Sequence, residues 1–468
     1  MAMETSVVMT LAFYPRGGSA QVARYLASAL GQCGTSVTLC SGSLGPEGSE
    51  TNARTFFAGL NVESVDFTAA VDAFAEGRDP MAVEVPIHPS FEDRPDVPDR
   101  VFADLDEDEY RSQVAPWSDL IGRVETPDVY HVHHLTHVNE AVRVHDQVPV
   151  IVHLHGTELK MLSAIRDGMS TWAHADAWSK RLIAAARRAD RLISISPADR
   201  DLAVDLLGVS PEVIEIVPNG VDLTRFSVEP LAVDDRMARW TEWLVDEPRG
   251  WDESGVVGSV AYTHAQVRGA FTHLESGEAL PVFLFVGRFL HFKRVPLLVR
   301  AYAAAREALG SATPPLVIWG GHPGEWEGDH PHAVAAELGV EGVFFAGWRG
   351  HDDLSVALNC ADALVAPSVD EPFGQVYLEA MASGLAVIGT QSGGPPSFIN
   401  TDPGRPDGWL VEPDSQAALT EALIAAAGDM TDTRTRGRNG RSVIERDYDW
   451  LHIAERVARI YSDVAANG

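Results

Sequence analysis

Two glutamates flank a glycine in the segment DEPFGQVYLEAMASG, residues 370–384. The stretch after Gly374 is typical of a helix that begins there, and the N–H groups at the start of a helix attract anions. Glu371 stands before this glycine and Glu379 stands after it. A carboxylate accepts hydrogen bonds and donates none, so it suits hydroxyl groups rather than phosphate. From the spacing alone, it is an equally good interpretation that Glu371 is simply an acid at a helix start and that Glu379 lies on a solvated helix face.

Arg288 and Lys293 follow the apolar run PVFLFVG at 281–287, which is typical of a buried strand. Both side chains can therefore reach the edge of the sheet at which such a strand ends. The chain holds three lysines against 33 arginines, and one of the three stands here. Fixed cations can stabilise negative charge that develops on a phosphate. Two solvated surface charges are the alternative.

Gly17 and Gly18 stand between the first apolar run, at 6–13, and a helical pattern. Glycine at such a junction lets the backbone approach a phosphate or a sugar, and a tight turn without a ligand is the alternative. A dinucleotide-binding fingerprint would require a third glycine and a following acid at spacings that PRGGSAQVA lacks.

Several histidines gather near two further apolar runs: His131, His133, His134, His137, His153 and His155. Such a group suggests a metal site. However, side chains alternate between the two faces of a strand, and no carboxylate completes a recognised ligand set. We therefore predict no metal at these histidines.

The length of 468 residues fits two domains of about 200 residues each. The formal net charge of −31 argues against nucleic acid and anionic membranes as partners. No apolar run approaches the roughly 20 residues of a membrane span, and no leader stands at Met1. Cys33, Cys40 and Cys360 show no CxxC or zinc spacing, which favours a reduced, cytoplasmic setting.

Apolar runs alternate with helical patterns along the chain, and the pattern restarts near residue 281. This alternation predicts α/β domains whose parallel sheets are covered on both faces by helices. We expect one domain at 1–220, with a C-terminal helix at 450–468 that packs back on it, and a second domain at 221–449. Ligands of open α/β sheets bind at the carboxyl ends of the strands, so we expect a cleft between the two domains.

Two segments fit neither pattern. Residues 84–116 are rich in proline and acid and show little periodicity. Residues 227–280 hold Trp240, Trp243 and Trp251 among glycines and charges. Loops of this length are functional or disordered in most proteins, and the tryptophans favour partial order in the second segment.

The motifs of the chain, in order, are YPRGG (14–18), HLHGTE (153–158), VPNGVD (217–222), FVGRFLHFK (285–293), PSVDEPFGQVYLEAMASG (367–384) and YDW (448–450). Together they resemble the retaining nucleotide-sugar glycosyltransferases of family 4. The resemblance implies the GT-B fold, in which two Rossmann-like, doubly wound domains face a central cleft. It also places the nucleotide sugar in the C-terminal domain and the acceptor in the N-terminal domain. The loop GGPPSFI (393–399) departs from the family pattern, and we assign it no role.

The resemblance implies a role for each residue of the donor site. The diphosphate would lie on the N–H groups of Gly374, Gln375 and Val376. Glu371 would bond hydroxyls of the transferred sugar, and Glu379 would bond the ribose diol. A carboxylate suits both tasks because it only accepts hydrogen bonds.

The catalytic residues implied by the resemblance are His155, Arg288, Lys293 and Glu371. The two cations would stabilise charge on the leaving β-phosphate, and His155 would contact the donor sugar near its reacting carbon. Gly17 and Gly18 would also lie on the donor. The candidates for the acceptor side are His133, His134 and Glu158.

We therefore predict a hexosyltransferase that moves a hexose-type sugar from a nucleotide sugar, with a UDP-sugar favoured, to a small polar acceptor. The predicted route is a metal-independent, front-face transfer that needs no cofactor and no side-chain nucleophile. The sequence does not decide whether the chain forms a homo-oligomer. The alternatives are a sugar-nucleotide epimerase or hydrolase of the same fold, a PLP-dependent phosphorylase, and a sugar-nucleotide-binding protein without activity.

The densest acidic stretch is FEDRPDVPDRVFADLDEDEY at 91–110. We expect it to form a mobile flap near the acceptor and to favour a small polar or cationic acceptor. A solvated acidic surface is the alternative.

Overall fold

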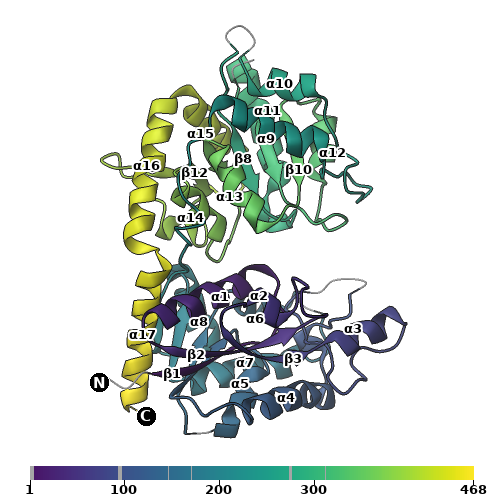
Figure 1. Cartoon of the computed structure of the whole chain (residues 1–468), viewed down its shortest axis with the longest axis vertical. Helices are drawn as coiled ribbons and strands as arrows, with labels where there is room; N and C mark the ends of the chain where they lie inside the picture. The colour runs from purple at the N-terminus through teal and green to yellow at the C-terminus, as the bar shows by residue number, and fades with distance from the viewer. Residues whose placement is uncertain are drawn as a thin grey trace. The chain divides into compact units, whose positions relative to one another are not determined.

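The computed structural model describes residues 5–92, 97–145, 147–169, 171–273, 277–310 and 313–467 (Figure 1). The chain divides into two compact units. The first unit comprises residues 1–220 and 450–468, and the second comprises residues 221–449. Each unit is an α/β sandwich around one sheet, and every strand pairing in the described residues is parallel. The predicted α/β class is therefore confirmed.

Within the described residues, the sheet of the first unit has the order β3-β2-β1-β4-β5-β6-β7. Its strands are β1 (Ser6–Leu11), β2 (Ser36–Ser43), β3 (Asn61–Asp66), β4 (Val129–His133), β5 (Val150–His153), β6 (Arg191–Ser194) and β7 (Ile214–Ile216). Alternate residues of a strand enter different cores: Val7 and Met9 pack with one, and Val8 packs with the other. Both faces of the sheet are therefore buried, as expected for a parallel sheet.

Helices cover both faces of this sheet (Figure 1). They are α1 (Gly17–Gln32), α2 (Ala53–Phe56), α3 (Thr68–Ala75), α4 (Glu107–Ile121), α5 (Val138–Ala141), α6 (Thr157–Arg166), α7 (Ala175–Arg188), α8 (Pro197–Leu207) and α17 (Trp450–Asn467). The C-terminal helix α17 packs on α1 and β4 and buries Ile453, Val457 and Tyr461 in the same core as Val7.

Within the described residues, the sheet of the second unit has the order β10-β9-β8-β11-β12-β13. Its strands are β8 (Phe283–Val286), β9 (Leu316–Trp319), β10 (Val343–Gly347), β11 (Ala363–Val365), β12 (Ala386–Thr390) and β13 (Gly408–Val411). Its helices are α9 (Val233–Thr241), α10 (His264–Phe271), α11 (Val295–Leu309), α12 (Pro331–Glu337), α13 (His351–Asn359), α14 (Gln375–Ala382), α15 (Gln416–Gly428) and α16 (Met430–Asp447). In both sheets the order reverses direction beside the first strand, which places the loops after β1 and β8 at a switch point where ligands bind in open α/β sheets.

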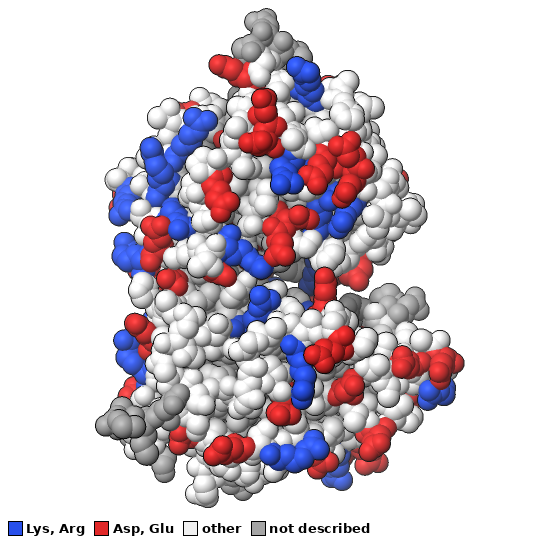
Figure 2. Space-filling view, viewed as in Figure 1, with Lys and Arg blue, Asp and Glu red and all other residues white. Residues whose placement is uncertain are grey.

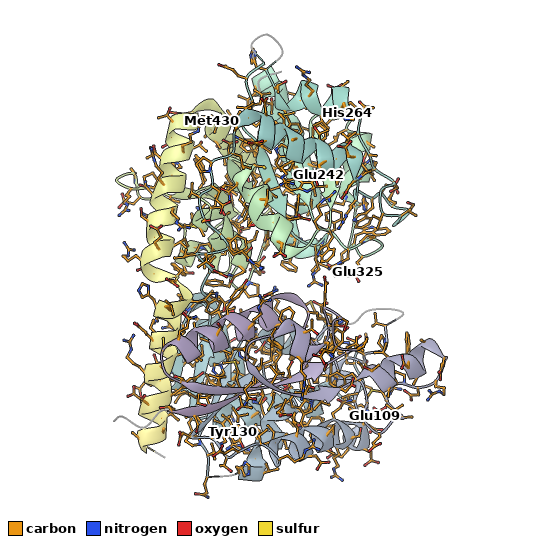
Figure 3. The ribbon with its side chains drawn as sticks, in the orientation of Figure 1. Glu109, Tyr130, Glu242, His264, Glu325 and Met430 are labelled. Atoms are coloured by element: carbon orange, nitrogen blue, oxygen red, sulfur yellow. The ribbon has the colours of Figure 1, made fainter. Side chains whose placement is uncertain are left out.

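The segment 84–116 is more ordered than its sequence predicts. Helix α4 begins with a capping box, in which Asp106 and Glu109 each accept from the other's backbone N–H. Figure 3 labels Glu109. Phe102 and Tyr110 are buried in the core of the first unit. The prediction of an aperiodic segment is therefore wrong for its C-terminal part, and residues 97–110 are a packed element rather than a free flap. Residues 93–96 of the acidic stretch lie outside the described residues.

The segment 227–280 wraps around the edge strand β10. Trp243 packs edge-on against Trp319 at a ring distance of 4.9 Å, whereas Trp251 stacks on Phe289 at 5.2 Å and belongs to the core of the opposite face. The hydroxyl of Tyr262 accepts the N–H of Phe345 at 2.9 Å. An edge strand needs such cover because its unpaired N–H groups would otherwise pair with another chain. The partial order predicted from the tryptophans is confirmed, and the segment closes the sheet.

Charged side chains of both signs are interspersed over the visible face of each unit (Figure 2). The net charge of −31 is therefore not gathered into one acidic field on this face. Among the described residues, no helix is both long enough and apolar enough to cross a membrane.

Candidate active site

The start of α14 is built as the sequence predicts. Gly374 precedes the helix with a φ of 94°, a left-handed conformation that disfavours a side chain. Gln375 and Val376 follow at the first helical positions and are partly exposed. The N–H of Tyr377 donates to the carbonyl of Gly374 at 3.0 Å, and the positive end of the helix dipole lies here, so this end of α14 suits a phosphate.

Lys293 and Glu371 form an ion pair in which the ammonium group donates to the carboxylate. Their side chains are only 16% and 12% exposed, although 78 positions separate them in the sequence. The N–H of Val369 donates to the carbonyl of Phe292 at 2.8 Å, so the loop after β8 and the loop before α14 are tied together. The structure therefore brings together two residues that the sequence assigned to phosphate and to sugar separately.

Arg288 follows β8 directly, at the same edge of the sheet as Lys293. Its positive charge is one of the causes that set the pKa of His322: burial lowers this pKa first, Glu325 opposes the change, and Arg288 lowers it further. The ring of His322 lies 5.3 Å from that of Trp348, whose side chain follows β10 and is exposed. A half-buried histidine thus packs on an exposed tryptophan, and this histidine is near enough to Arg288 for its pKa to respond to that charge.

Glu379 lies on α14, two turns after Gly374, and is 6% exposed. Burial raises the pKa of its carboxyl from 4.5 to about 8, against an opposing effect of Arg225. In the ligand-free protein, this group is therefore protonated at neutral pH. A neutral carboxyl both donates and accepts a hydrogen bond, and the bond from Glu379 to a ribose diol stays a prediction.

In the first unit, Glu158 organises the loop after β5. One carboxylate oxygen accepts the N–H of His155 at 3.1 Å, and the other lies 3.3 Å from Nδ1 of His134 and 3.2 Å from the hydroxyl of Thr157. Burial would raise the pKa of Glu158, but His134 and hydrogen bonds from the backbone N–H groups of Glu158 and His155 hold it below its ordinary value. The fully buried side chain is thus an ionised acceptor of hydrogen bonds.

His133 and His155 share a hydrogen bond of 2.8 Å between Nδ1 and Nε2. Burial lowers the pKa of both imidazoles well below the ordinary value, and neighbouring histidines lower it further. Both rings are therefore neutral at physiological pH, when each can donate one hydrogen bond and accept one. The predicted residues at and after the ends of β4 and β5 form one connected cluster that comprises His133, His134, His155 and Glu158.

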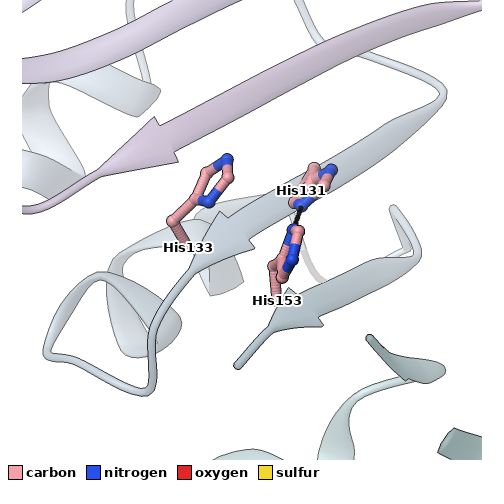
Figure 4. A group of neighbouring side chains, drawn as sticks. All are labelled: His131, His133 and His153. Atoms are coloured by element: carbon pink, nitrogen blue, oxygen red, sulfur yellow. Dashed lines mark hydrogen bonds between the residues drawn. The ribbon is translucent and has the colours of Figure 1, made fainter. Parts of the chain in front are cut away.

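Three histidines lie closer together than the alternation of side chains along a strand predicts (Figure 4). His131, His133 and His153 offer nitrogen atoms within 4.8 Å of one another. Their rings are stacked, however, with 15° between the planes of His131 and His133 and 22° between those of His133 and His153. Lone pairs lie in the ring planes, so stacked rings do not converge on one ion. His131 and His153 instead share a hydrogen bond of 3.2 Å, and the absence of a metal stays a prediction.

Two family models match this chain. Glycosyltransferase Family 4 matches residues 16–225, and Glycosyl transferases group 1 matches residues 280–429. Together the matched residues make up more than half of the chain. The chain belongs to the family 4, group 1 glycosyltransferases. It is accordingly an enzyme of the hexosyltransferase class.

Curated relatives of this glycosyltransferase are 27% to 34% identical to it over the aligned residues. The D-inositol 3-phosphate glycosyltransferase of Corynebacterium glutamicum is 34% identical over 40% of this chain and 44% of its own length. The enzyme of the same name from Nocardia farcinica is 27% identical over 77% of this chain and 73% of its own. The alpha-maltose-1-phosphate synthase of Mycolicibacterium smegmatis is 30% identical over 62% and 66%.

Solved structures show the fold of the glycosyltransferase. Sucrose-phosphate synthase from Thermosynechococcus elongatus matches with a TM-score of 0.67 and 18% identity, over 99% of this chain and 100% of that one. HepE from Anabaena, solved with UDP and glucose, matches with a TM-score of 0.65 and 16% identity, over 98% and 100%. These neighbours are GT-B glycosyltransferases, and the predicted fold class is confirmed.

Two glycines that the sequence left without a role support the donor loop of the glycosyltransferase. A Cβ on Gly393 would lie 2.3 Å from the carbonyl oxygen of Glu371, and one on Gly394 would lie 2.6 Å from the Cα of Phe373. The hydroxyl of Ser392 also bonds the carboxylate of Asp370 at 2.7 Å. The loop after β12 therefore holds Glu371 in place through its backbone. The only sequence signal is the adjacent pair of glycines.

Asp99, which sequence reasoning missed, lies beside the first glycine loop. Its carboxylate is 3.3 Å from the guanidinium group of Arg16, and the aspartate is nearly buried. Arg16 also donates to the hydroxyl of Tyr14 at 2.9 Å. The acidic stretch thus anchors the residues that precede Gly17.

Substitution of Gly18 with alanine is expected to preserve the fold and to raise the KM for the donor about tenfold or more. A Cβ on Gly18 meets no described atom within 4 Å, so the protein itself leaves this space open. Alanine also favours a helix relative to glycine. Steady-state kinetics and thermal unfolding measure both effects.

Gly31→Ala is the matched control, because Gly31 lies on the same helix and its Cβ also meets nothing within 4 Å. An unchanged donor KM in Gly18→Ala, equal to that of Gly31→Ala, would show that the open space at Gly18 serves no ligand.

Proposed function

We propose that this glycosyltransferase moves a hexose from a nucleotide sugar, with a UDP-sugar favoured, to a small hydroxyl-rich acceptor with retention of configuration. The observation that carries the proposal is the meeting of Lys293 and Glu371 beside the start of α14. One local arrangement thus offers N–H groups and an ammonium for a diphosphate and a carboxylate for sugar hydroxyls. The structural neighbour HepE, which was solved in complex with UDP and glucose, supports this donor class.

In the proposed reaction, the bond between C1 of the sugar and the leaving diphosphate breaks first and leaves an ion pair with oxocarbenium character. The acceptor hydroxyl then attacks C1 on the face that the diphosphate leaves. Its proton passes to an oxygen of the leaving phosphate, so no side-chain base is needed. Lys293 and Arg288 would stabilise the charge on this phosphate more strongly in the transition state than in the ground state.

The cluster around Glu158 supports an acceptor with several hydroxyl groups. His155 is a partly exposed, neutral ring that can donate and accept a hydrogen bond, and the buried Glu158 and His133 hold its backbone N–H and its Nε2 in place. Relatives named for D-inositol 3-phosphate favour a polyol of this kind.

Incubation with a panel of UDP-sugars and polyols tests the proposal. Release of UDP should depend on the acceptor, and the anomeric proton coupling of the product should match that of the donor. Release of UDP without an acceptor would favour a hydrolase, a rearranged donor would favour an epimerase, and affinity without turnover would favour a binding protein. An inverted product would contradict the retaining route.

Treatment with EDTA is expected to leave the rate within a small factor of that of the untreated enzyme. The proposed site supplies Arg288 and Lys293 as fixed cations for the diphosphate, which is the task of a divalent ion in metal-dependent transferases. Initial rates before and after chelation, with Mg²⁺ and Mn²⁺ added back, measure this. A complete loss that either ion restores would contradict the metal-independent route.

A further inference from the structure

The first unit contains a cavity of about 210 Å³ between α7 and the turn that follows β4. Helices α4, α5 and α7 lie on the same side of the sheet, and Trp117, Ala141 and Trp178 from these helices share one core (Figure 1). None of the cavity's lining residues belongs to the candidate active site. The cavity is therefore a separate feature of this unit.

Positive charge surrounds this cavity. Arg143, Lys180, Arg181 and Arg188 line it, and Glu140 is the one carboxylate among its lining residues. This balance contrasts with the net charge of −31 of the whole chain. Local cations at a concave surface raise the concentration of anions there.

Part of this charge is already fixed within the protein. Arg181 pairs with Glu107 and lies 4.0 Å from the centre of the Tyr110 ring, whose hydroxyl donates to Glu140 at 3.0 Å. These contacts form a rigid wall in which Glu140 is already hydrogen-bonded. Lys180 and Arg188, also on α7, add their charges at the same cavity.

Two buried donors in the lining lack an acceptor. Nε1 of Trp178 and Nδ2 of Asn139 have no hydrogen-bond partner among the described residues, although the side chains are only 2% and 7% exposed. The other end of the Asn139 amide accepts the N–H of Thr136 at 2.6 Å, which fixes its orientation. Buried N–H groups without a partner are rare, because each costs the free energy of a lost hydrogen bond with water.

We propose that this cavity is a second binding site, for a small organic phosphate. A phosphate group offers several acceptor oxygens to the N–H groups of Asn139 and Trp178, and its charge suits Lys180 and Arg188. The apolar side chains of Leu182 and Ala185 also line the cavity and suit the carbon skeleton of an ester. Inorganic phosphate shares the same chemistry and is the second probe below.

The test follows the indole N–H of Trp178 by NMR in the full-length chain with ¹⁵N-labelled tryptophan, with the signal assigned through Trp178→Phe. Glycerol 3-phosphate should shift this signal in a saturable way at constant ionic strength, and glycerol should not. Tighter binding of the ester than of inorganic phosphate identifies an organic phosphate as the ligand class, and the reverse order identifies the free ion. The first order supports the proposal, and the reverse order contradicts its assignment to an organic phosphate.

The double variant Lys180→Ala/Arg188→Ala should weaken the binding at least tenfold. Arg200→Ala, which removes a charge from the neighbouring helix α8, should bind as the unaltered protein does. The proposal fails if the Trp178 signal does not move up to about 10 mM of either phosphate, ten times a millimolar dissociation constant. It also fails if the double variant keeps full affinity.

Discussion

Replacement of Lys293 with alanine lowers turnover by about two to three orders of magnitude and leaves the fold intact. The expected loss is large because this ammonium group is mostly buried and already fixed by Glu371, so it needs little reorganisation to meet charge on the leaving phosphate. Glu371→Ala should cause a similar loss, since it removes both the acceptor of sugar hydroxyls and the partner that orients Lys293.

The double variant Lys293→Ala/Glu371→Ala shows whether the two residues act as one unit or make two separate contacts. Because Lys293 and Glu371 hold each other, the combined loss should be well below the product of the single losses. Arg300→Ala is the control. Arg300 lies on α11, which follows the loop that holds Lys293, and its ion pair with Asp329 at 3.2 Å is exposed to solvent. Near-normal turnover in both single variants, measured at saturating donor with thermal unfolding unchanged, would overturn the assignment of this site.

Regular elements of the fold could be predicted because their apolar patterns are local. The runs at 281–287 and 6–13 are short and apolar, and they form β8 and β1. The segment at 107–121 gave no such signal. It begins with several acids and holds Pro116, yet Tyr110 and Trp117 bury one face of α4. Tertiary burial of a few aromatic residues outweighs the weak helical pattern there.

The chemical groups of the site could be predicted from motifs, but their contacts could not. The pairing of Lys293 with Glu371 joins residues 78 positions apart, and no local pattern encodes it. The support from Gly393 is a backbone contact that leaves no side-chain signature. The protonation of Glu379 depends on burial by the whole unit, which spacing along a helix does not reveal.

Glu379→Gln is expected to make the second unit more stable at pH 8 to 9 and to have little effect near pH 4.5. The pKa of this carboxyl is about 8 in the folded chain, against an ordinary value of 4.5. Between these two values, the folded state holds a proton that the unfolded state has lost, so the stability of the unaltered protein falls as the pH rises. The slope from this one group approaches about 1.4 kcal/mol per pH unit. A glutamine has nearly the same shape and no charge to desolvate, so it removes this contribution.

Urea unfolding at several pH values, followed by tryptophan fluorescence, measures the difference between the two proteins. The difference in the free energy of unfolding between Glu379→Gln and the unaltered protein should increase by several kcal/mol from pH 5 to pH 8 and then become constant. This order of magnitude follows from the size of the pKa shift. Glu421→Gln on α15 is the control, because Glu421 is exposed and its substitution should leave the pH profile unchanged. Parallel profiles for Glu379→Gln and the unaltered protein would show that the carboxyl is ionised in the folded chain. In that case Glu379 would meet a ribose diol as a carboxylate, as the motif alone suggests, and its burial would have to be balanced by hydrogen bonds to the ionised form.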